Sequence, residues 1–222
     1  MSAAIKESGI KSLAYTSSST AALMPQPNKV IKVTKDTWDD DAVNIANGPN
    51  PDAWNIYGAS KTEAERAVWK KVKETRPSFQ VATVLPNAMF GAVLKPQGRN
   101  SSSTSSWALK LFDGDADAFD DFPPQYFVDV RDTARLMVIG LTDPVCNGER
   151  IFSFAAPFNR EDTLAVFRKL YPDREFPKDK QGTGKDLSQI PNEDAEALLR
   201  KHYGKGFSGF EETLAALTAS VE

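Results

Sequence analysis

The stretch Tyr57-Gly58-Ala59-Ser60-Lys61 opens a segment with no further glycine or proline before Pro77. Within that segment Ala64, Ala67 and Val68 recur at helical spacing, which predicts an amphipathic helix. The first and last residues of the stretch stand one helical turn apart, and positions i and i+4 share a face of a helix. We therefore expect the phenol and the ammonium group to project into the same cleft.

A tyrosine beside a lysine is a candidate general acid or base. The phenol of a free tyrosine has a pKa of about 10, so it needs its environment to lower that value before it exchanges protons readily near neutral pH. The positive charge of Lys61 favours the phenolate form of Tyr57. A surface helix with a tyrosine near its first turn explains the same spacing, and a short motif alone does not decide between the two.

Three serines follow a predicted strand upstream of this helix. Residues 11–16 contain the run Leu13-Ala14-Tyr15, which is typical of a buried parallel strand. Ligands bind at the carboxyl ends of such strands, so a hydroxyl there is placed to hydrogen-bond a carbonyl oxygen. Serines also satisfy amide groups in turns, a role that we expect for Ser17 and Ser19 rather than for Ser18.

The remaining pattern predicts an α/β fold. Residues 79–85 read as a second strand that ends at Pro86-Asn87, and the order of strand, helix and strand predicts a βαβ unit with a right-handed crossover. Residues 2–8 predict a helix closed by Gly9 in a left-handed cap. The other expected elements are helix 40–47, helix 107–112, strand 125–130, helix 131–141, strand 149–155 and helices 163–170, 193–201 and 210–221. We expect the last three helices to form a smaller lobe.

The composition excludes several classes of function. With 222 residues, 41% of them apolar, a net charge of -3 and a pI near 5.4, the chain is not suited to binding nucleic acid. A single cysteine, Cys146, and a single histidine, His202, exclude a disulfide framework, a Cys/His zinc site and most histidine-based triads. The adjacent acids Asp39-Asp40-Asp41 cannot converge on one ion in ordinary geometry, so no metal site is predicted. No run of eighteen apolar residues suggests a membrane span, and we expect a cytoplasmic protein.

Other short motifs accompany Tyr57-x-x-x-Lys61 along the chain. They are Thr16-Ser17-Ser18, Asp36-Thr37-Trp38, Leu85-Pro86-Asn87, Val128-Asp129-Val130-Arg131-Asp132, Gly148-Glu149-Arg150-Ile151 and Tyr171-Pro172-Asp173. In this set and order the chain resembles the extended short-chain dehydrogenase/reductases. Within them it is most similar to the fungal and plant carbonyl reductases related to dihydroflavonol 4-reductase and methylglyoxal reductase. The likeness covers nearly the whole chain, so it is far more specific than any single motif.

The resemblance implies the C-terminal part of a Rossmann-like parallel sheet with a smaller, mainly helical substrate lobe. Residues 1–92 would be a remnant of the Rossmann-like core that carries the catalytic residues. Residues 93–222 would form the mixed substrate-binding lobe and the last core elements. Asp129 and Asp132, which could be mistaken for catalytic acids, would cap and brace a junction between a strand and a helix.

The resemblance also implies a reaction, the reduction of an aldehyde or ketone to an alcohol, with NADP as the expected cofactor and NAD not excluded. Ser18 would hold the carbonyl oxygen, Tyr57 would donate the proton, and Lys61 would lower the pKa of Tyr57 and contact the nicotinamide ribose. The backbone at Pro86 and Asn87 would lie against the nicotinamide ring. The small-molecule carbonyl substrate would lie in a pocket whose lining residues include Phe90, Trp107 and Tyr126.

One part of the family pattern is missing before Ser18. Family members begin with a strand, a Gly-rich turn and a helix whose N-terminus holds the pyrophosphate, and no such turn precedes Ser18. The resemblance places Met1 in the helix before the fifth strand. The strand at 11–16 would then lose a neighbour, and its exposed edge would allow self-association. We expect weak or no activity from the 222-residue chain by itself.

Two other functions stay open. A non-catalytic interaction or regulatory remnant of such an enzyme would explain the missing turn, although loss of Ser18, Tyr57 or Lys61 would then be expected. A nucleotide-sugar epimerase or dehydratase of the same superfamily is the other alternative. The motifs that contain Trp38 and Tyr171 favour the reductase branch over it.

Overall fold

The first of two sheets is fully parallel. The computed structural model describes residues 1–94 and 103–221. In it, β1 (Ser12–Thr16), β2 (Gln80–Pro86) and β5 (Arg150–Ser153) pair in the order β1-β2-β5. Helix α3 (Ala53–Thr75) connects β1 to β2, so the predicted βαβ unit is confirmed. Within the described residues β1 pairs only with β2, and it therefore forms one edge of the sheet.

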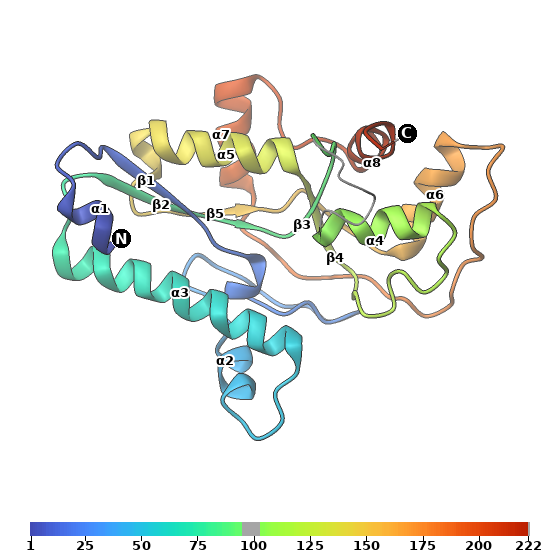
Figure 1. Ribbon diagram of the computed structural model, residues 1–222, viewed down its shortest axis with the longest axis horizontal. Helices are drawn as coiled ribbons and strands as arrows, with labels where there is room; N and C mark the ends of the chain where they lie inside the picture. Colours follow the sequence, from blue (N-terminus) through green and yellow to red (C-terminus); the bar gives the residue numbers. More distant parts are fainter. Residues whose placement is uncertain (95–102, 222) are drawn as a thin grey trace.

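Helices cover both faces of this sheet (Figure 1). Leu13 and Val81 face α3 and the short helix α1 (Ser2–Lys6), while Ala82 and Val84 face α5 (Val130–Thr142) and α7 (Glu193–Tyr203). Because neighbouring residues of a strand point to opposite faces, β2 packs against both helical layers. The predicted α/β fold with a Rossmann-like parallel sheet is confirmed.

Helix α7 lies in a different place from the one predicted. Its buried residues Ala195 and Leu199 pack with Val84 and Ile151 of the first sheet, so α7 covers the first sheet and does not belong to a smaller lobe. The two residues stand four positions apart and form one apolar stripe. The sequence pattern showed the stripe but not which core it would cover.

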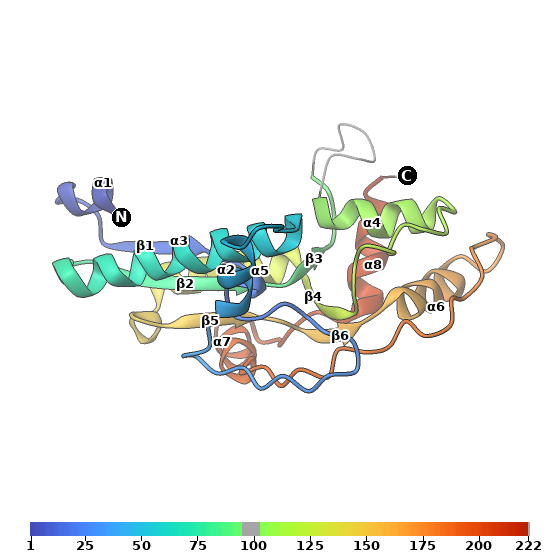
Figure 2. The ribbon, with the colours of Figure 1, turned by 90° about the horizontal axis from the view of Figure 1, so that it is seen from below.

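The second sheet is small and mixed. Strand β4 (Gln125–Asp129) pairs in parallel with β3 (Ala88–Phe90) and antiparallel with β6 (Ala156–Phe158). Figure 2 shows three helices grouped around these strands: α4 (Ser103–Phe112), α6 (Arg160–Leu170) and α8 (Phe210–Ala219). β3 and β6 were not predicted, because three residues are too few for a readable alternation.

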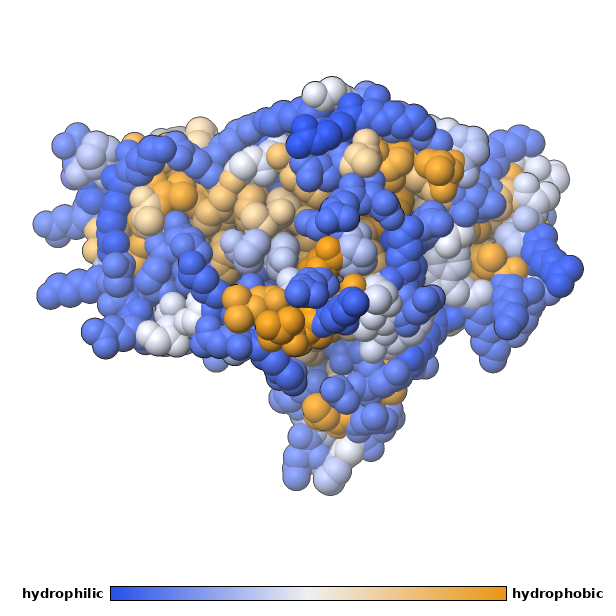
Figure 3. Space-filling model, turned by 180° about the vertical axis from the view of Figure 1, so that it is seen from behind, coloured by the Kyte–Doolittle hydropathy of each residue, from blue (hydrophilic) through white to orange (hydrophobic). Residues whose placement is uncertain are grey.

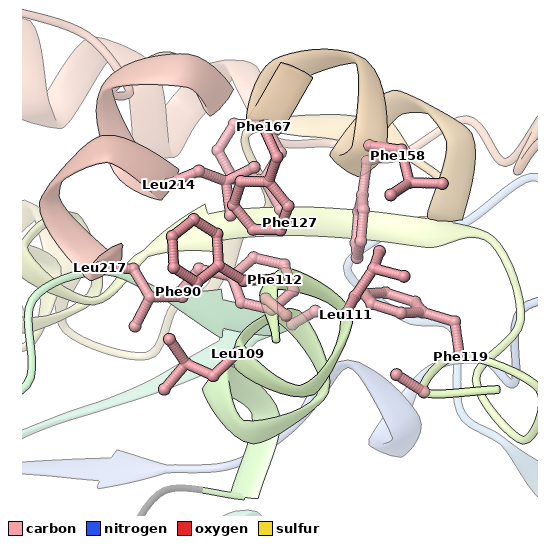
Figure 4. Packing of buried hydrophobic residues seen from close by; sticks show 14 of the residues in the cluster. Phe90, Leu109, Leu111, Phe112, Phe119, Phe127, Phe158, Phe167, Leu214 and Leu217 are labelled. Atoms are coloured by element: carbon pink, nitrogen blue, oxygen red, sulfur yellow. The ribbon is translucent and has the colours of Figure 1, made fainter. Parts of the chain in front are cut away.

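Phenylalanine rings fill the core between the second sheet and its helices. In Figure 4 the side chains from β3, β4, β6, α4 and α6 point toward one another. The ring centroids of Phe90 and Phe158 lie 5.2 Å apart, as do those of Phe112 and Phe167. Both pairs have the edge-to-face geometry that aromatic rings prefer. We call this cluster the aromatic core, with Phe90, Phe112, Phe119, Phe122, Phe127, Phe158, Phe167, Leu164, Leu214 and Leu217 among its members.

Two buried carboxylates hold the junction between β4 and α5, as predicted. Asp129 accepts hydrogen bonds from the backbone and guanidinium of Arg131 and from the Thr213 hydroxyl, which lies 3.0 Å away. Burial acts to raise the pKa of Asp129, but these hydrogen bonds outweigh it and hold the pKa below its ordinary value. Asp132 accepts the backbone N–H of Ser208 at 2.6 Å. Both acids are therefore structural.

Outside the two cores, the helices and turns of the described residues are short. Helix α1 ends at Lys6, and Gly9 has no positive φ angle, so the predicted left-handed cap is wrong. Helix α2 (Asp40–Ala46) is capped by the preceding residue Asp39, whose carboxylate accepts the Ala42 N–H. Two 3-10 turns, η1 (Ser19–Ala21) and η2 (Pro144–Cys146), complete the elements. The domain division at residue 92 stays a prediction.

On the face shown in Figure 3, hydrophilic residues surround apolar patches. Among residues 1–94 and 103–221, no helix combines the length and apolar character needed to cross a bilayer.

Candidate active site

A pocket of about 340 Å³ lies at the carboxyl ends of β1 and β2. This is the end at which ligands bind in open parallel sheets. All the residues predicted for catalysis and cofactor binding line it, namely Ser18, Tyr57, Lys61, Pro86 and Asn87. They come from β2, the end of β1 and α3, so the βαβ unit brings together residues that are far apart in the sequence.

Helix α3 presents Tyr57 and Lys61 to this pocket. The helix begins at Ala53, because the Asp52 carboxylate accepts the Asn55 N–H at 3.0 Å and caps the first turn. Tyr57 is 42% exposed, and Lys61 Nζ donates a hydrogen bond to the Thr16 carbonyl at 3.3 Å. The lysine is thus fixed to the end of β1 with its charge beside the pocket.

The glycine next to Tyr57 allows a close contact between two helices. A Cβ atom at Gly58 would lie 3.0 Å from the Cβ of Ala42 and 3.5 Å from the sulfur of Met24. Few real Cβ contacts are that short, so the absence of a side chain lets α2 pack directly on α3. The contact places the first two turns of α3 against the loop that follows β1.

A second phenol lies near the same lysine. Lys61 Nζ is 5.9 Å from the centre of the Tyr15 ring. Burial, and to a smaller degree the charges of Glu65 and Tyr57, raise the pKa of Tyr15. Tyr15 therefore stays protonated at neutral pH, and it does not line the pocket. Tyr57 is the phenol that is placed to meet a bound molecule.

Ser18 begins the turn η1 and keeps a proton available. Its Oγ accepts the Thr20 N–H at 3.3 Å and the Thr20 hydroxyl at 3.0 Å. A hydroxyl has one proton and two lone pairs. Both lone pairs of Ser18 accept hydrogen bonds from Thr20, so the Ser18 proton is available to a ligand. We predicted that Ser17 and Ser19 would satisfy turn amides. This prediction is wrong for Ser17, whose Oγ donates to Glu65 at 2.7 Å. The amide of the turn, that of Thr20, is bound by Ser18 instead.

The step from β2 to β3 forms another wall of the pocket. The Asn87 N–H donates to the Ser153 carbonyl at 3.3 Å, and the Asn87 side chain accepts the Ala88 N–H at 2.8 Å. Asn87 is buried. These bonds hold the backbone after Pro86 against β5 and the start of β3.

The aromatic border of the pocket differs from the predicted one. Trp107 lines the pocket, as predicted, but Phe90 and Tyr126 do not. Phe90 is fully buried in the aromatic core. The Tyr126 hydroxyl donates to the Ser188 carbonyl at 2.8 Å, and its ring packs on Phe154. The strand positions of both residues turn their side chains away from the pocket.

Two further aromatic residues line the pocket and were missed. The ring centroids of Trp54 and Trp107 lie 6.0 Å apart, and those of Trp107 and Phe122 lie 4.1 Å apart. We call these three residues the aromatic wall. Trp54 stands three positions before Tyr57, so recognising Asp52 as the helix cap would have placed both on one helical face.

One Gly-x-Gly-x-x-Gly spacing does occur in the chain, at residues 204–209. It follows helix α7 rather than a strand, and Gly204 is the left-handed cap that ends α7. A Cβ atom at Gly206 would collide with the Glu196 side chain, which occupies the space. The following helix α8 carries Glu211 and Glu212 in its first turn. The surrounding structure therefore does not fit a pyrophosphate.

Other chemistry finds little support in the described part of the chain. Residues 1–94 and 103–221 hold no group of three or more potential metal ligands. Asp39 caps α2, and Asp40 pairs with Arg66. Burial raises the pKa of the Cys146 thiol to about 11, so it is not a ready nucleophile.

The chain is similar to known reductases over nearly all of its length. No family model matches it. It is 35% identical over 225 residues to Aldehyde reductase 2 of Sporidiobolus salmonicolor, covering 98% of this chain and 65% of that protein. It is also 35% identical over 219 residues to Ketoreductase adrE of Penicillium rubens, covering 96% of this chain and 63% of that protein. The chain thus spans slightly less than two thirds of these relatives.

Solved structures show the same fold. Gre2 from Candida albicans, in complex with NADPH, superposes with a TM-score of 0.79 at 21% identity, and the match covers 96% of this chain and 64% of that one. At this identity the likeness concerns the fold, and the first sheet with its helices is Rossmann-like.

Proposed function

Because the chain is 35% identical to Aldehyde reductase 2 over 98% of its own length, we propose that it belongs to the extended short-chain dehydrogenase/reductase family. We propose further that its pocket is the reaction end of a carbonyl reductase. The reaction is the reduction of a small apolar aldehyde or ketone to an alcohol with NADPH. One observation carries the proposal: a serine hydroxyl, a tyrosine phenol and a lysine ammonium group line a single pocket of about 340 Å³.

The residues of the pocket fit the nicotinamide end of a dinucleotide. Lys61 and Tyr57 would hold the nicotinamide ribose, and the backbone at Pro86 and Asn87 would support the ring. When bound, the cofactor supplies a hydride to the carbonyl carbon. Among residues 1–94 and 103–221, no Gly-rich turn joins a strand to a helix, so we expect the affinity of these residues for the pyrophosphate end to be weak.

The protein's own groups would handle the proton and the charge on oxygen. The Tyr57 phenol would donate a proton to the carbonyl oxygen. The Ser18 hydroxyl, whose lone pairs are already bonded to Thr20, donates a hydrogen bond to the same oxygen. The Lys61 ammonium stabilises the phenolate that remains on Tyr57.

The aromatic wall would receive the apolar part of the substrate. Trp54, Trp107 and Phe122 offer flat apolar surface beside the reacting groups. Contact with these rings would also exclude water from the carbonyl. We therefore expect ketones and aldehydes with an aryl or branched alkyl group to be better substrates than short polar ones.

The direct test follows NADPH consumption with a panel of aliphatic aldehydes, aryl ketones and α-dicarbonyl compounds at millimolar NADPH. We expect turnover with at least one apolar member and none above background with Tyr57→Phe. Binding of NADPH without turnover of any compound would contradict the proposal and favour a non-catalytic role. Saturation at micromolar NADPH would contradict the expected weak affinity.

A further inference from the structure

A fully buried carboxylate lies on the same helix as Tyr57 and Lys61. The oxygens of Glu65 accept hydrogen bonds from Ser17 Oγ and Thr83 Oγ1, each at 2.7 Å. They also accept Arg150 Nε at 2.8 Å, a second Arg150 nitrogen at 3.2 Å and the Trp69 indole N–H at 3.2 Å. Glu65 is 0% exposed. A carboxylate this far from water is tolerated only when it is paired and hydrogen-bonded, as this one is.

The arginine of the pair is also held on its other side. Arg150 Nη1 donates to the carbonyls of Lys35 and Thr37, at 2.8 and 2.7 Å. Its guanidinium lies over the Trp38 ring, 3.9 Å from the ring centre, a favourable position for a cation. The pair therefore connects α3 to β2, β5, the end of β1 and the loop around residue 37.

These bonds lead directly to the reacting groups. Glu65 stands one turn after Lys61 and two turns after Tyr57, so the three share a face of α3. Its partner Ser17 is the residue before Ser18. One carboxylate thus fixes the helix that carries the phenol and the ammonium group to the strand end that carries the hydroxyl.

We propose that Glu65, held by Arg150, is a positioning residue that sets the relative placement of the Ser18 hydroxyl and the Tyr57 phenol. The inference rests on the proposed function. Glu65 does not line the pocket, so it acts through Ser17 and α3 rather than on the substrate. A buried ion pair can often be replaced by apolar side chains of similar volume with no loss of stability. Replacing both partners removes the two buried charges together, but it leaves the donors on Ser17, Thr83 and Trp69 without their acceptor. We therefore expect a folded but less stable protein with an impaired reaction.

The test compares Glu65→Met/Arg150→Met and Glu65→Gln with the wild type. The matched control is Glu63→Gln, because Glu63 lies on the same helix with its side chain 59% exposed and pairs with Arg66. We expect kcat to fall about 10- to 100-fold in the double variant, as small misplacements of reacting groups can cost. KM should stay within about twofold, and the double variant should still unfold in one cooperative thermal transition, at a lower temperature than the wild type. Glu63→Gln should behave as the wild type.

A second readout does not depend on turnover. With 3-fluorotyrosine incorporated, Tyr57→Phe identifies the Tyr57 fluorine resonance. We expect one narrow Tyr57 resonance in the wild type and in Glu63→Gln, and a broadened or divided one in the double variant. If the wild type turns nothing over, the proposed function fails, but this readout still tests positioning.

Several results would overturn the positioning role of Glu65. A folded double variant with an unchanged Tyr57 resonance, or with a kcat near that of the wild type, contradicts the proposal. If the double variant does not fold, Glu65→Gln decides. A folded Glu65→Gln with about tenfold lower kcat supports positioning, and one with unchanged kcat and unchanged resonance overturns it.

Discussion

The two sheets of this chain differ in what is buried around them. Around the first sheet, the polar side chains of Glu65 and Arg150 are buried and hydrogen-bonded on the face that α3 covers. Around the second sheet, the core consists largely of phenylalanine rings such as Phe112 and Phe158. Hydrogen bonds depend on direction, whereas apolar packing depends mainly on shape and area.

The pocket takes a different contribution from each region. The first sheet and α3 supply the reacting groups of Ser18, Tyr57 and Lys61, and the second region supplies Trp107 and Phe122. Groups that transfer protons need fixed orientation, which directional bonds provide. A surface that accepts an apolar substituent needs only a stable shape, which ring packing provides. The division between polar and apolar burial thus follows the division of tasks.

The largest expected effect tests the first region. Tyr57→Phe removes the proposed proton donor, so we expect the rate of carbonyl reduction to fall about 10²- to 10⁴-fold. Thermal unfolding should be unchanged, because no hydrogen bond to the phenol oxygen is seen within the described residues and the side chain is 42% exposed. Paired measurements of kcat and unfolding temperature check this. If Tyr57→Phe lost activity and stability together, the contrast drawn between the two regions would not hold.

The next prediction addresses the aromatic core. Phe112→Ala leaves a cavity among Phe167, Tyr171 and Phe176, whose rings contact Phe112. We expect the free energy of unfolding to fall by about 3–5 kcal/mol. Urea unfolding measures the loss. A decrease below about 1 kcal/mol would show that the second region does not depend on close ring packing.

A smaller effect is expected where the second region meets the pocket. Trp107→Leu removes ring surface from the aromatic wall but leaves the reacting groups in place. We expect KM for an aryl ketone to rise about tenfold, with kcat within about threefold of the wild type. Steady-state kinetics separate a change in KM from a change in kcat. A selective loss of kcat would mean that this wall orients the carbonyl rather than binding its substituent.

The smallest effect sharpens the comparison, because it concerns a polar exception in the second region. The bonds from Arg131 and Thr213 hold the pKa of Asp129 below its ordinary value. A depressed folded-state pKa stabilises the fold above the unfolded-state pKa of about 3.9, and this contribution is lost as the pH falls through the folded-state value. Asp129→Asn should therefore weaken the acid dependence of stability below about pH 4. Urea unfolding at several pH values checks this, and an identical dependence in both proteins would exclude Asp129 as a contributor.

Much of the first sheet could be predicted from the sequence. The long helix with Tyr57 and Lys61 has clear periodicity, and each flanking strand ends at a polar or proline residue. The family motifs then placed the expected reaction residues. Both kinds of signal are local, and here the local signal agrees with the tertiary arrangement.

The parts that could not be predicted depend on contacts between distant residues. The sequence gives no sign that Glu65 and Arg150 meet, because 85 positions separate them. Phe90 and Tyr126 are aromatic, but only their strand registers decide that they point away from the pocket. The apolar stripe of α7 could pack on either core. Which core it covers depends on the course of the chain before α7, and this is not visible in the stripe itself.

The four tryptophans of the chain form two pairs. The fluorescence of each pair would report on a different part of the structure. Trp54 and Trp107 face the pocket, whereas Trp38 and Trp69 contact the two ends of the buried ion pair. A nicotinamide that enters the pocket would quench the fluorescence of the first pair. Phenylalanine in place of one pair at a time would let a single emission spectrum follow either ligand entry or the integrity of the buried charges.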